Sequence, residues 1–459
     1  MTAASGHDAS PPRLDDHCLS ITGHIIDVSP QAFRVAGLSP FVRLGDRIAC
    51  PGDDGDAIGE VVRIEQGSLT VKPFANRFVR GVKAPARQIG PFMVSPARSW
   101  KGRVLDAFGR PTDGKGPVTE GDDPRRADAP PLPAMQRGRT GKPVATGVRA
   151  LDIFTPLVRG QRIGIFAGSG VGKSTLMSML ARAKGFDTVV VALVGERGRE
   201  VREFLEETMA GNLSKVVTIV ATGDESPMMR RLAPRTATSV AEYFRDRGDS
   251  VLLIVDSVTR LAHAARDVAL AAGEPPVARG YPPSVFSELP QLLERAGPGL
   301  EGSGSITGIF SVLVDGDDHN DPIADAIRGT LDGHIVLDRA IAEQGRFPAV
   351  DVLKSISRLA DRAWNPQERE LVSRLRSMIS RYEDTRDLRL LGGYQRGSDQ
   401  TLDQAVDLVP HVYDHLVQHP EEGPCKQPFE DLSARLKKSF QPPVPATAAA
   451  PVPAKSAAG

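Results

Sequence analysis

Cysteine is scarce in this sequence, which has three such residues, Cys18, Cys50 and Cys425, among 459. An odd number of widely separated cysteines fits neither a disulfide framework nor a metal cluster, so we expect the protein to reside in a reducing cytosol.

Long apolar runs are missing as well. No run is long enough to cross a bilayer, and residues 1–17 lack the apolar core of a signal peptide. Any membrane association is therefore expected to be peripheral or through partners.

An excess of charge is also missing. The 57 Lys and Arg residues balance 57 Asp and Glu residues, and only 5% of the residues are aromatic. Nucleic-acid-binding proteins usually carry a basic excess, and single-strand binders interleave basic with aromatic side chains. We therefore expect no nucleic-acid partner.

Composition divides the chain into several regions. Residues 1–18 are polar and rich in Pro and Ala, and residues 441–459 repeat Ala and Pro, so we expect a disordered N-terminal arm and a disordered tail. Residues 19–85 hold short alternating apolar segments separated by turn residues, the pattern of a small β-barrel. Residues 363–440 repeat apolar side chains at helical spacing and predict a C-terminal helical domain.

The middle of the chain, residues 86–362, predicts an α/β domain. It opens with a connector rich in Pro, Gly and Arg over about residues 91–143. It then contains apolar β-branched runs that are too continuous for half-exposed strands, which indicates a buried parallel sheet flanked by helices. These runs are Val189–Val194, Val216–Val220, Val251–Val255 and Ile306–Leu313.

One apolar run breaks into a glycine-rich loop and then opens a helix. Its glycines let backbone N–H groups turn toward a polyphosphate, and the helix adds the positive end of its dipole. Lys173 can reach the terminal phosphates, and the Ser174 hydroxyl suits Mg²⁺. The strict motif begins with Gly where this chain has Ala167, a small residue that we expect to fit. The predicted nucleotide-binding residues here are Gly168, Ser169, Gly170, Val171, Gly172, Lys173, Ser174 and Thr175.

A phosphate-binding loop alone does not separate a hydrolase from a nucleotide sensor. Asp256 ends one apolar run, which places its carboxylate at the carboxyl edge of the sheet, where it can hold the Mg²⁺ shell. Glu196 follows another run, and a carboxylate there can orient an attacking water and take up its proton. Composition alone does not rank Glu196 above Glu200 or Glu203. Each of these acids can also be an ordinary turn or surface residue.

Two further segments resemble a known family. Pro348–Arg358, with the sequence Pro-Ala-Val-Asp-Val-Leu-Lys-Ser-Ile-Ser-Arg, resembles the signature of the catalytic-type subunits of rotary ATP synthases. Gly195-Glu196-Arg197 resembles their catalytic glutamate segment. The resemblance covers most of the chain except the two tails. Three other segments resemble the protein-export branch of that superfamily, namely Gly280–Phe286, Gly316–Asp318 and Asp321–Leu337. This branch contains the ATPases of flagellar and virulence type III secretion.

The resemblance implies a RecA-like P-loop domain and an Mg-dependent ATPase whose cofactors are ATP and Mg²⁺. It assigns Lys173 to the phosphates as a catalytic residue, and Ser174 and Asp256 to the metal. Glu196 is assigned to the attacking water.

Two more assignments follow from the same resemblance. Arg358 becomes an arginine finger that reaches the site of a neighbouring subunit and neutralises charge on the transferred phosphoryl group. Phe347 aligns with an aromatic residue that packs against adenine, with an ordinary core phenylalanine as the alternative. Because one chain carries the loop, Glu196 and Arg358 together, identical subunits can complete each other's sites, and we expect a homohexamer.

The function that the resemblance implies is ATP hydrolysis that energises type III export of flagellar proteins. The expected location is the cytoplasm, peripheral at the inner-membrane export apparatus. The implied partners are a stator-like regulator on the N-terminal arm, a central stalk protein, membrane proteins of the export gate, and export substrates with their chaperones.

Three alternatives stay open at this point. The first is the ATPase of a virulence type III secretion system, which uses the same catalytic parts. The second is a non-catalytic nucleotide-binding subunit of a rotary ATPase, against which Glu196 argues. The third, a ring-shaped RNA translocase, lacks a basic patch interleaved with aromatic residues.

Overall fold

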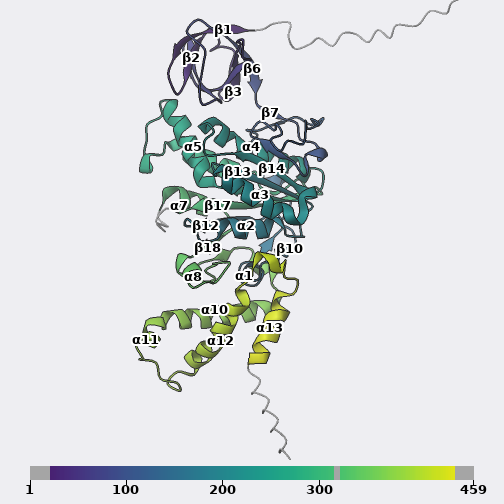
Figure 1. Cartoon of the computed structure of the whole chain (residues 1–459), viewed down its shortest axis with the longest axis vertical. Coiled ribbons are helices and arrows are strands. Elements are labelled where there is room, and N and C mark those ends of the chain that lie inside the picture. Colours follow the sequence, from purple (N-terminus) through teal and green to yellow (C-terminus); the bar gives the residue numbers. More distant parts are fainter. Residues whose placement is uncertain (1–20, 315–320, 440–459) are drawn as a thin grey trace, which may run out of the picture.

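The computed structural model describes residues 21–314 and 321–439. It contains three parts that follow one another along the long axis: a β-barrel, a central sheet with helices on both faces, and a group of helices (Figure 1). The predicted arm 1–18 and tail 441–459 lie outside the described residues, as does Gly316–Asp318. The three-part α/β architecture expected from the sequence is confirmed.

The N-terminal barrel is closed by six antiparallel strands in the order β1-β2-β5-β4-β3-β6. Its interior is a small apolar core that includes the buried side chains of Phe33, Ile48 and Val71. The barrel extends to Pro91, so the predicted boundary at residue 85 is wrong. Pro85, Gly90 and Pro91 look like strand breakers, but proline is tolerated at strand ends. The strands are β1 Thr22–Val28, β2 Phe33–Ala36, β3 Asp46–Cys50, β4 Ala57–Glu65, β5 Ser68–Pro73 and β6 Pro85–Pro91.

The predicted connector is only partly a connector. Within it, β8 (Val104–Asp106) pairs in parallel with β14 (Val216–Ala221) and forms one edge of the central sheet. Three residues are too few to show a periodicity, which is why the sequence pattern gave no strand there. The remaining short elements are β7 Met93–Val94, η1 Arg98–Trp100, β9 Arg125–Arg126, η2 Ala134–Gln136, β10 Pro143–Val144 and β11 Leu157–Val158.

The central sheet has nine strands, eight of them in the order β19-β18-β12-β17-β15-β13-β14-β8, with β16 paired to β17. In this spatial order, every neighbouring pair from β18 through to β8 is parallel. The four predicted apolar runs are strands β13, β14, β15 and β17, as expected. Their carboxyl ends therefore share one edge of the sheet. The strands not yet given are β12 Arg162–Ala167, β13 Thr188–Val194, β15 Ser250–Asp256, β16 Gly297–Pro298, β17 Ser305–Leu313, β18 Gly333–Leu337 and β19 Ile356–Ser357.

Helices cover both faces of this sheet, because successive side chains of a strand point to opposite sides. Along β13, Val190 and Ala192 belong to one core, together with side chains of α4 to α7. Val189 and Val191 belong to a second core, together with α1, α2, α3 and the C-terminal helices. The helices are α1 Arg149–Phe154, α2 Lys173–Ala181, α3 Gly198–Asn212, η3 Leu213–Lys215, α4 Pro227–Arg245, α5 Val258–Ala271, η4 Ala278–Gly280, α6 Pro283–Leu293, α7 Pro322–Thr330 and α8 Arg339–Glu343.

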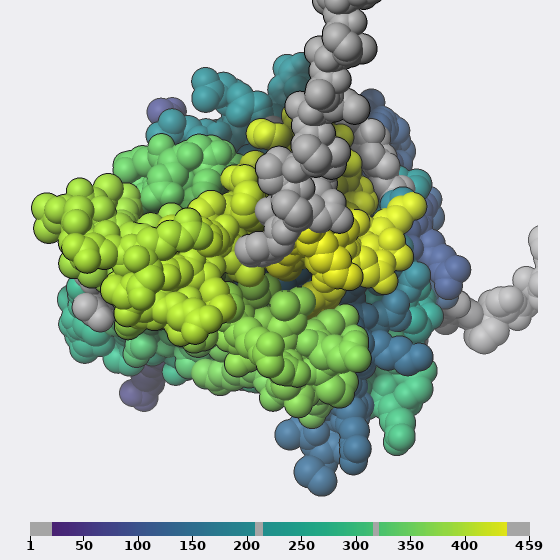
Figure 2. Space-filling model, turned by 90° about the horizontal axis from the view of Figure 1, so that it is seen from below, coloured from purple at the N-terminus to yellow at the C-terminus, as the bar shows by residue number. Residues whose placement is uncertain are grey.

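The C-terminal helices pack against the second core. The predicted apolar stripes lie on α10 and α12, where Leu375, Ile379, Ala405 and Val409 are buried. Seen from below, these segments cover the lower end of the molecule in green to yellow (Figure 2). In the described part of the chain, no helix is both long and apolar enough to span a bilayer. The helices are α9 Ala360–Ala363, α10 Pro366–Asp384, α11 Arg386–Leu390, α12 Gln400–Leu416, η6 Pro420–Glu422 and α13 Pro428–Ser439.

Candidate nucleotide-hydrolysis site

The predicted phosphate-binding loop lies between the end of β12 and the start of α2. Gly170 and Gly172 have φ angles of 77° and 90°, in the left-handed region that glycine adopts without steric cost. Ala167 is the last residue of β12, pairs with Leu313 and Leu337, and is buried. A small strand residue thus takes the place of the usual first glycine without disturbing the loop that follows.

The remaining loop residues divide into buried and open positions. Val171 is buried in the second core, so it can serve a phosphate only through its backbone. Ser169 and Ser174 are exposed. The first turn of α2 therefore presents the Ser174 hydroxyl and free N–H groups at the open side of the sheet edge, which is the arrangement that anions favour.

The sheet brings Lys173 against two acidic side chains from neighbouring strand ends. Asp256 is the final residue of β15, and Glu196 lies two residues after β13. The Lys173 ammonium forms an ion pair with the Asp256 carboxylate, and its Nζ lies 3.6 Å from Oε1 of Glu196. Both acids are nearly inaccessible, with exposed fractions of 3% for Asp256 and 8% for Glu196. The predicted lysine, glutamate and aspartate thus occupy one site.

The two carboxylates are held differently. Asp256 accepts a hydrogen bond of 2.6 Å from the Ser311 hydroxyl in addition to its ion pair. Oε1 of Glu196 is buried and accepts no hydrogen bond from any described residue. Burial and the negative charge of Asp256 raise the pKa of Glu196 to about 7, against the opposing effect of Lys173. A carboxyl with a pKa near neutrality and an oxygen that still lacks a hydrogen bond is suited to accept a proton from water.

Arg260 joins this site, although the sequence analysis did not single it out. It lies in the first turn of α5, and its Nε is 3.4 Å from Oε1 of Glu196. Its side chain also packs against Gly195, where a Cβ would approach Arg260 to 2.7 Å. The signal was present, because Arg260 follows Asp256 by four residues at the start of a helix, which is where a side chain returns to the same edge.

Arg358 lies far from the loop of its own chain. It follows β19, which pairs with the first residues of β18, and its backbone N–H donates to the carbonyl of Asp332. The loop, in contrast, follows the other end of the sheet, where Ala167 pairs with Leu337. Along β18 these two ends are separated by about 13 Å. The Arg358 side chain is exposed and has no hydrogen bond or ion pair with any described residue.

Phe347 lies beside the loop. A Cβ built on Gly172 would lie 3.4 Å from the Phe347 ring, and the ring is 39% exposed. The Phe347 carbonyl accepts a hydrogen bond of 2.8 Å from the backbone N–H of Gln418. Phe347 is therefore a partly exposed aromatic ring at the rim of the site and is tied to the C-terminal region.

Comparisons with known proteins identify the family of the chain. Residues 147–357 match the ATP synthase alpha/beta family, nucleotide-binding domain, and residues 364–438 match the T3SS EscN ATPase C-terminal domain. The chain is 56% identical over 422 residues to a flagellum-specific ATP synthase of Rhizobium meliloti, covering 92% of this chain and 90% of the relative. It is 43% identical over 419 residues to a type 3 secretion system ATPase of Xanthomonas euvesicatoria, covering 90% and 91%.

A solved structure shows the same likeness. The assembled ATPase EscN of the enteropathogenic E. coli type III secretion system superposes with a TM-score of 0.84 at 38% identity, covering 91% of this chain and 99% of EscN. A second structure contains EscN in complex with its central stalk EscO. The chain belongs to the type III export ATPases of the ATP synthase alpha/beta family.

The structure of this export ATPase distinguishes Glu196 from its acidic neighbours. Glu203 lies on α3, is exposed, and pairs with Arg199 at 3.2 Å. Glu200, at the start of α3, is half-buried; it lies 3.9 Å from Arg197, and its side chain hydrogen-bonds Glu196, which helps to raise the pKa of Glu196. Glu196 alone of the three is buried against Lys173 and Asp256. The ranking that composition could not give is thus supplied by position.

The ATPase offers Mg²⁺ a fitting set of donors. Ser174 and Asp256 supply oxygen atoms, the ligands that Mg²⁺ prefers, from the loop helix and the end of β15. Within residues 21–314 and 321–439, no group of three or more His, Cys, Asp or Glu could hold a metal ion. Mg²⁺ does not require one, because it is usually held by one or two protein oxygens together with substrate phosphates.

Proposed function

We propose that this ATPase energises the export of flagellar proteins. The observation that carries the proposal is its identity to a flagellum-specific ATP synthase, 56% over 92% of the chain, against 43% to a type 3 secretion system ATPase. The ATPase of a virulence secretion system is the second candidate, because both systems use the same catalytic parts.

In this proposal the chain's own residues divide the work of hydrolysis. Lys173 leaves Asp256 when ATP binds and neutralises the β- and γ-phosphates, and the loop N–H groups hold their oxygens. Ser174 and Asp256 would hold Mg²⁺, which would screen the phosphate charge. Glu196 orients the attacking water through Oε1, which accepts no hydrogen bond from the described residues, and takes up its proton, and Arg260 supports the orientation of that carboxylate.

The rest of the site comes from a second copy of the chain. The exposed Arg358 stands at the end of the sheet opposite to its own loop, so it serves a neighbouring subunit. A planar guanidinium there stabilises the charge of the transferred phosphoryl group. A homohexameric ring gives every subunit one such neighbour. EscN, which was solved in an assembled form, supports this proposal by its likeness.

The proposed setting is the cytoplasmic side of the inner membrane, where the ring docks peripherally at the export apparatus. A central stalk protein binds the ring; EscN was solved in complex with its central stalk EscO. The exposed leucines of the α11 segment, Leu388, Leu390 and Leu391, offer an apolar surface for it. A stator-like regulator on residues 1–18, membrane proteins of the export gate, and chaperone-bound substrates complete the proposed set. Nucleic acid is not among the partners.

Deletion of the gene tests the flagellar assignment. We expect loss of filaments and loss of secreted filament subunits, with restoration by the wild-type gene but not by a gene encoding Glu196→Gln. Normal filaments in the deletion strain would reject the flagellar role and favour a virulence system. Restoration by Glu196→Gln with full turnover of the purified variant would instead favour a non-catalytic nucleotide-binding subunit.

A further inference from the structure

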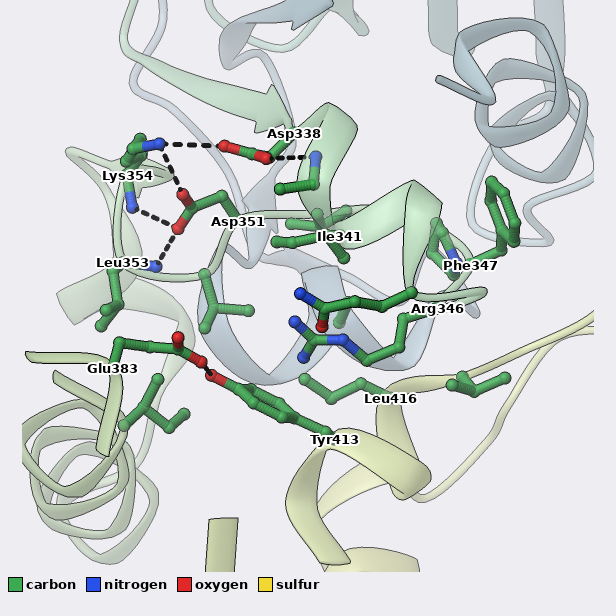
Figure 3. Close-up of a pocket in the computed structure, with 18 of the residues that line it drawn as sticks. Asp338, Ile341, Arg346, Phe347, Asp351, Leu353, Lys354, Glu383, Tyr413 and Leu416 are labelled. Atoms are coloured by element: carbon green, nitrogen blue, oxygen red, sulfur yellow. Dashed lines mark hydrogen bonds and ion pairs between the residues drawn. The ribbon is translucent and has the colours of Figure 1, made fainter. Parts of the chain in front are cut away.

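A cavity of about 300 Å³ lies where the helical domain meets the segment that carries Phe347 (Figure 3). One wall comes from residues 338–354, which include α8, and the other from α10 and α12. Ile341, Leu353, Ile379 and Leu416 give it an apolar lining. The volume suffices for a small molecule with one or two rings, and pockets at domain boundaries commonly bind such ligands.

We call this space, between residues 338–354 and helices α10 and α12, the hinge cavity. Its acidic side chains already have hydrogen-bond or ion-pair partners. Lys354 lies 3.0 Å from Asp338 and 3.1 Å from Asp351, and both carboxylates also accept backbone N–H groups. Glu383 accepts a hydrogen bond of 2.5 Å from the Tyr413 hydroxyl. A ligand would therefore find few acceptors that still need a donor.

The donors of the cavity are less well satisfied. The Arg346 guanidinium stacks over the Tyr413 ring at 3.9 Å, and its buried Nε has no hydrogen-bond partner among the described residues. Arg386, at the start of α11, adds a second guanidinium to the lining and forms no ion pair with another described residue. A buried donor without an acceptor is costly, so an occupant that supplies an acceptor is favoured.

We propose that the hinge cavity binds a small amphiphilic anion, with a flat apolar body against Ile341 and Leu416 and a carboxylate or sulfonate on Arg346. Such a ligand regulates the nucleotide site. Arg346 is adjacent in sequence to Phe347, whose ring borders Gly172 and whose carbonyl is bound by Gln418 after α12. An occupant that fixes Arg346 against α12 therefore also fixes the position of Phe347, and the two affinities become reciprocally coupled.

Fluorescence titration of the intact ATPase with 1-anilinonaphthalene-8-sulfonate, an aromatic sulfonate, tests the site without any turnover. We expect one saturable site per chain. Arg346→Ala should raise its Kd at least about tenfold, and Ile341→Trp, which fills the cavity, should abolish binding. Arg374→Ala is the matched control, because Arg374 is exposed on α10 and, among the described residues, forms an ion pair only with Glu370, so the Kd of this variant should stay unchanged. Circular dichroism of each variant identifies any that fails to fold.

A second titration in the presence of Mg²⁺ and a non-hydrolysable ATP analogue tests the coupling. We expect the dye's Kd to change by a factor of about five or more and then to reach a plateau. A Kd that rises without limit would place the dye in the nucleotide site, and a Kd that does not change would remove the regulatory role. Unaltered binding in Arg346→Ala and Ile341→Trp would reject the site itself. None of these outcomes depends on flagellar export, so the two proposals can fail separately.

Discussion

Glu196 and Arg358 occupy opposite kinds of surroundings. Glu196 is buried at the carboxyl edge of the sheet within reach of Lys173 and Arg260, and its partners all come from the same chain. Arg358 is exposed at the other end of β18 and has no side-chain partner among the described residues. Because the Arg358 guanidinium is solvated in the single chain, its exposure to a neighbouring subunit costs little free energy. The difference teaches that one half of the proposed site is preorganised within the chain, whereas the other half is completed on assembly.

Removal of Arg358 should give the largest effect. Arg358→Ala is expected to lower kcat by about 10³ to 10⁵, since an arginine finger contributes a factor of that size. Its melting temperature should stay close to that of the wild type, because the side chain has no partner to lose. Steady-state ATPase assays and calorimetry measure the two quantities. Arg362→Ala is the control, since Arg362 is also exposed, and its guanidinium donates a hydrogen bond to Thr140 of the same chain.

Mixing experiments sharpen the same point. Arg358→Ala subunits retain Glu196, and Glu196→Gln subunits retain Arg358, so mixed rings contain some complete sites. Activity should therefore reappear when the two inactive proteins are mixed. A mixture as inactive as its components, or a wild-type specific activity that is constant down to monomer concentrations, would contradict a site shared between subunits.

Glu196→Gln should give the next largest effect. Loss of a general base typically costs about 10² to 10⁴ in kcat, and the KM for ATP should change little because Lys173 and the loop remain. Glu203→Gln, on the exposed surface of α3, is the matched control and should retain full activity. If Glu203→Gln instead lost activity while Glu196→Gln kept it, the buried carboxylate would not be the base.

The sequence predicted the half of the site that parallel strands assemble. Continuous apolar runs identified β13 and β15, and the residues that follow such strands necessarily meet at one edge, so Glu196 and Asp256 were found together. The three-residue strand β8 gave no periodic signal. The stacking of Arg346 on Tyr413 joins segments that are far apart in the chain, and only tertiary packing brings them together. Local patterns therefore predict strand-end chemistry well and contacts at domain boundaries poorly.

The pKa of Glu196 predicts a smaller effect. Because the pKa is raised to about 7, the carboxyl is mostly protonated at pH 6 and mostly ionised at pH 8. A base must be ionised, so kcat/KM should rise about tenfold between these pH values and level off above them. Ionisation also opposes folding: the pKa of the folded state lies above the unfolded value of about 4.3, so this cost is absent below that pH and complete above about pH 7. Glu196→Gln should give a flat activity profile and lose less stability over that range.

Substitution of Phe347 should give the smallest effect on activity. It tests whether an exposed side chain can still belong to the half of the site that is preorganised within one chain. Its ring borders Gly172 but remains 39% exposed, so it resembles Arg358 in exposure and Glu196 in location. If it stacks on the base, Phe347→Ala should raise the KM for ATP about two- to tenfold, the range of an aromatic pair, with kcat nearly unchanged. Phe347→Tyr should behave as wild type. Phe347→Ala should also raise the KM for GTP by a similar factor, because stacking requires only a flat base. If Phe347→Ala instead loses stability while its KM for ATP stays constant, Phe347 is a packing residue. The nucleotide site would then not include this ring beyond the phosphate-binding loop.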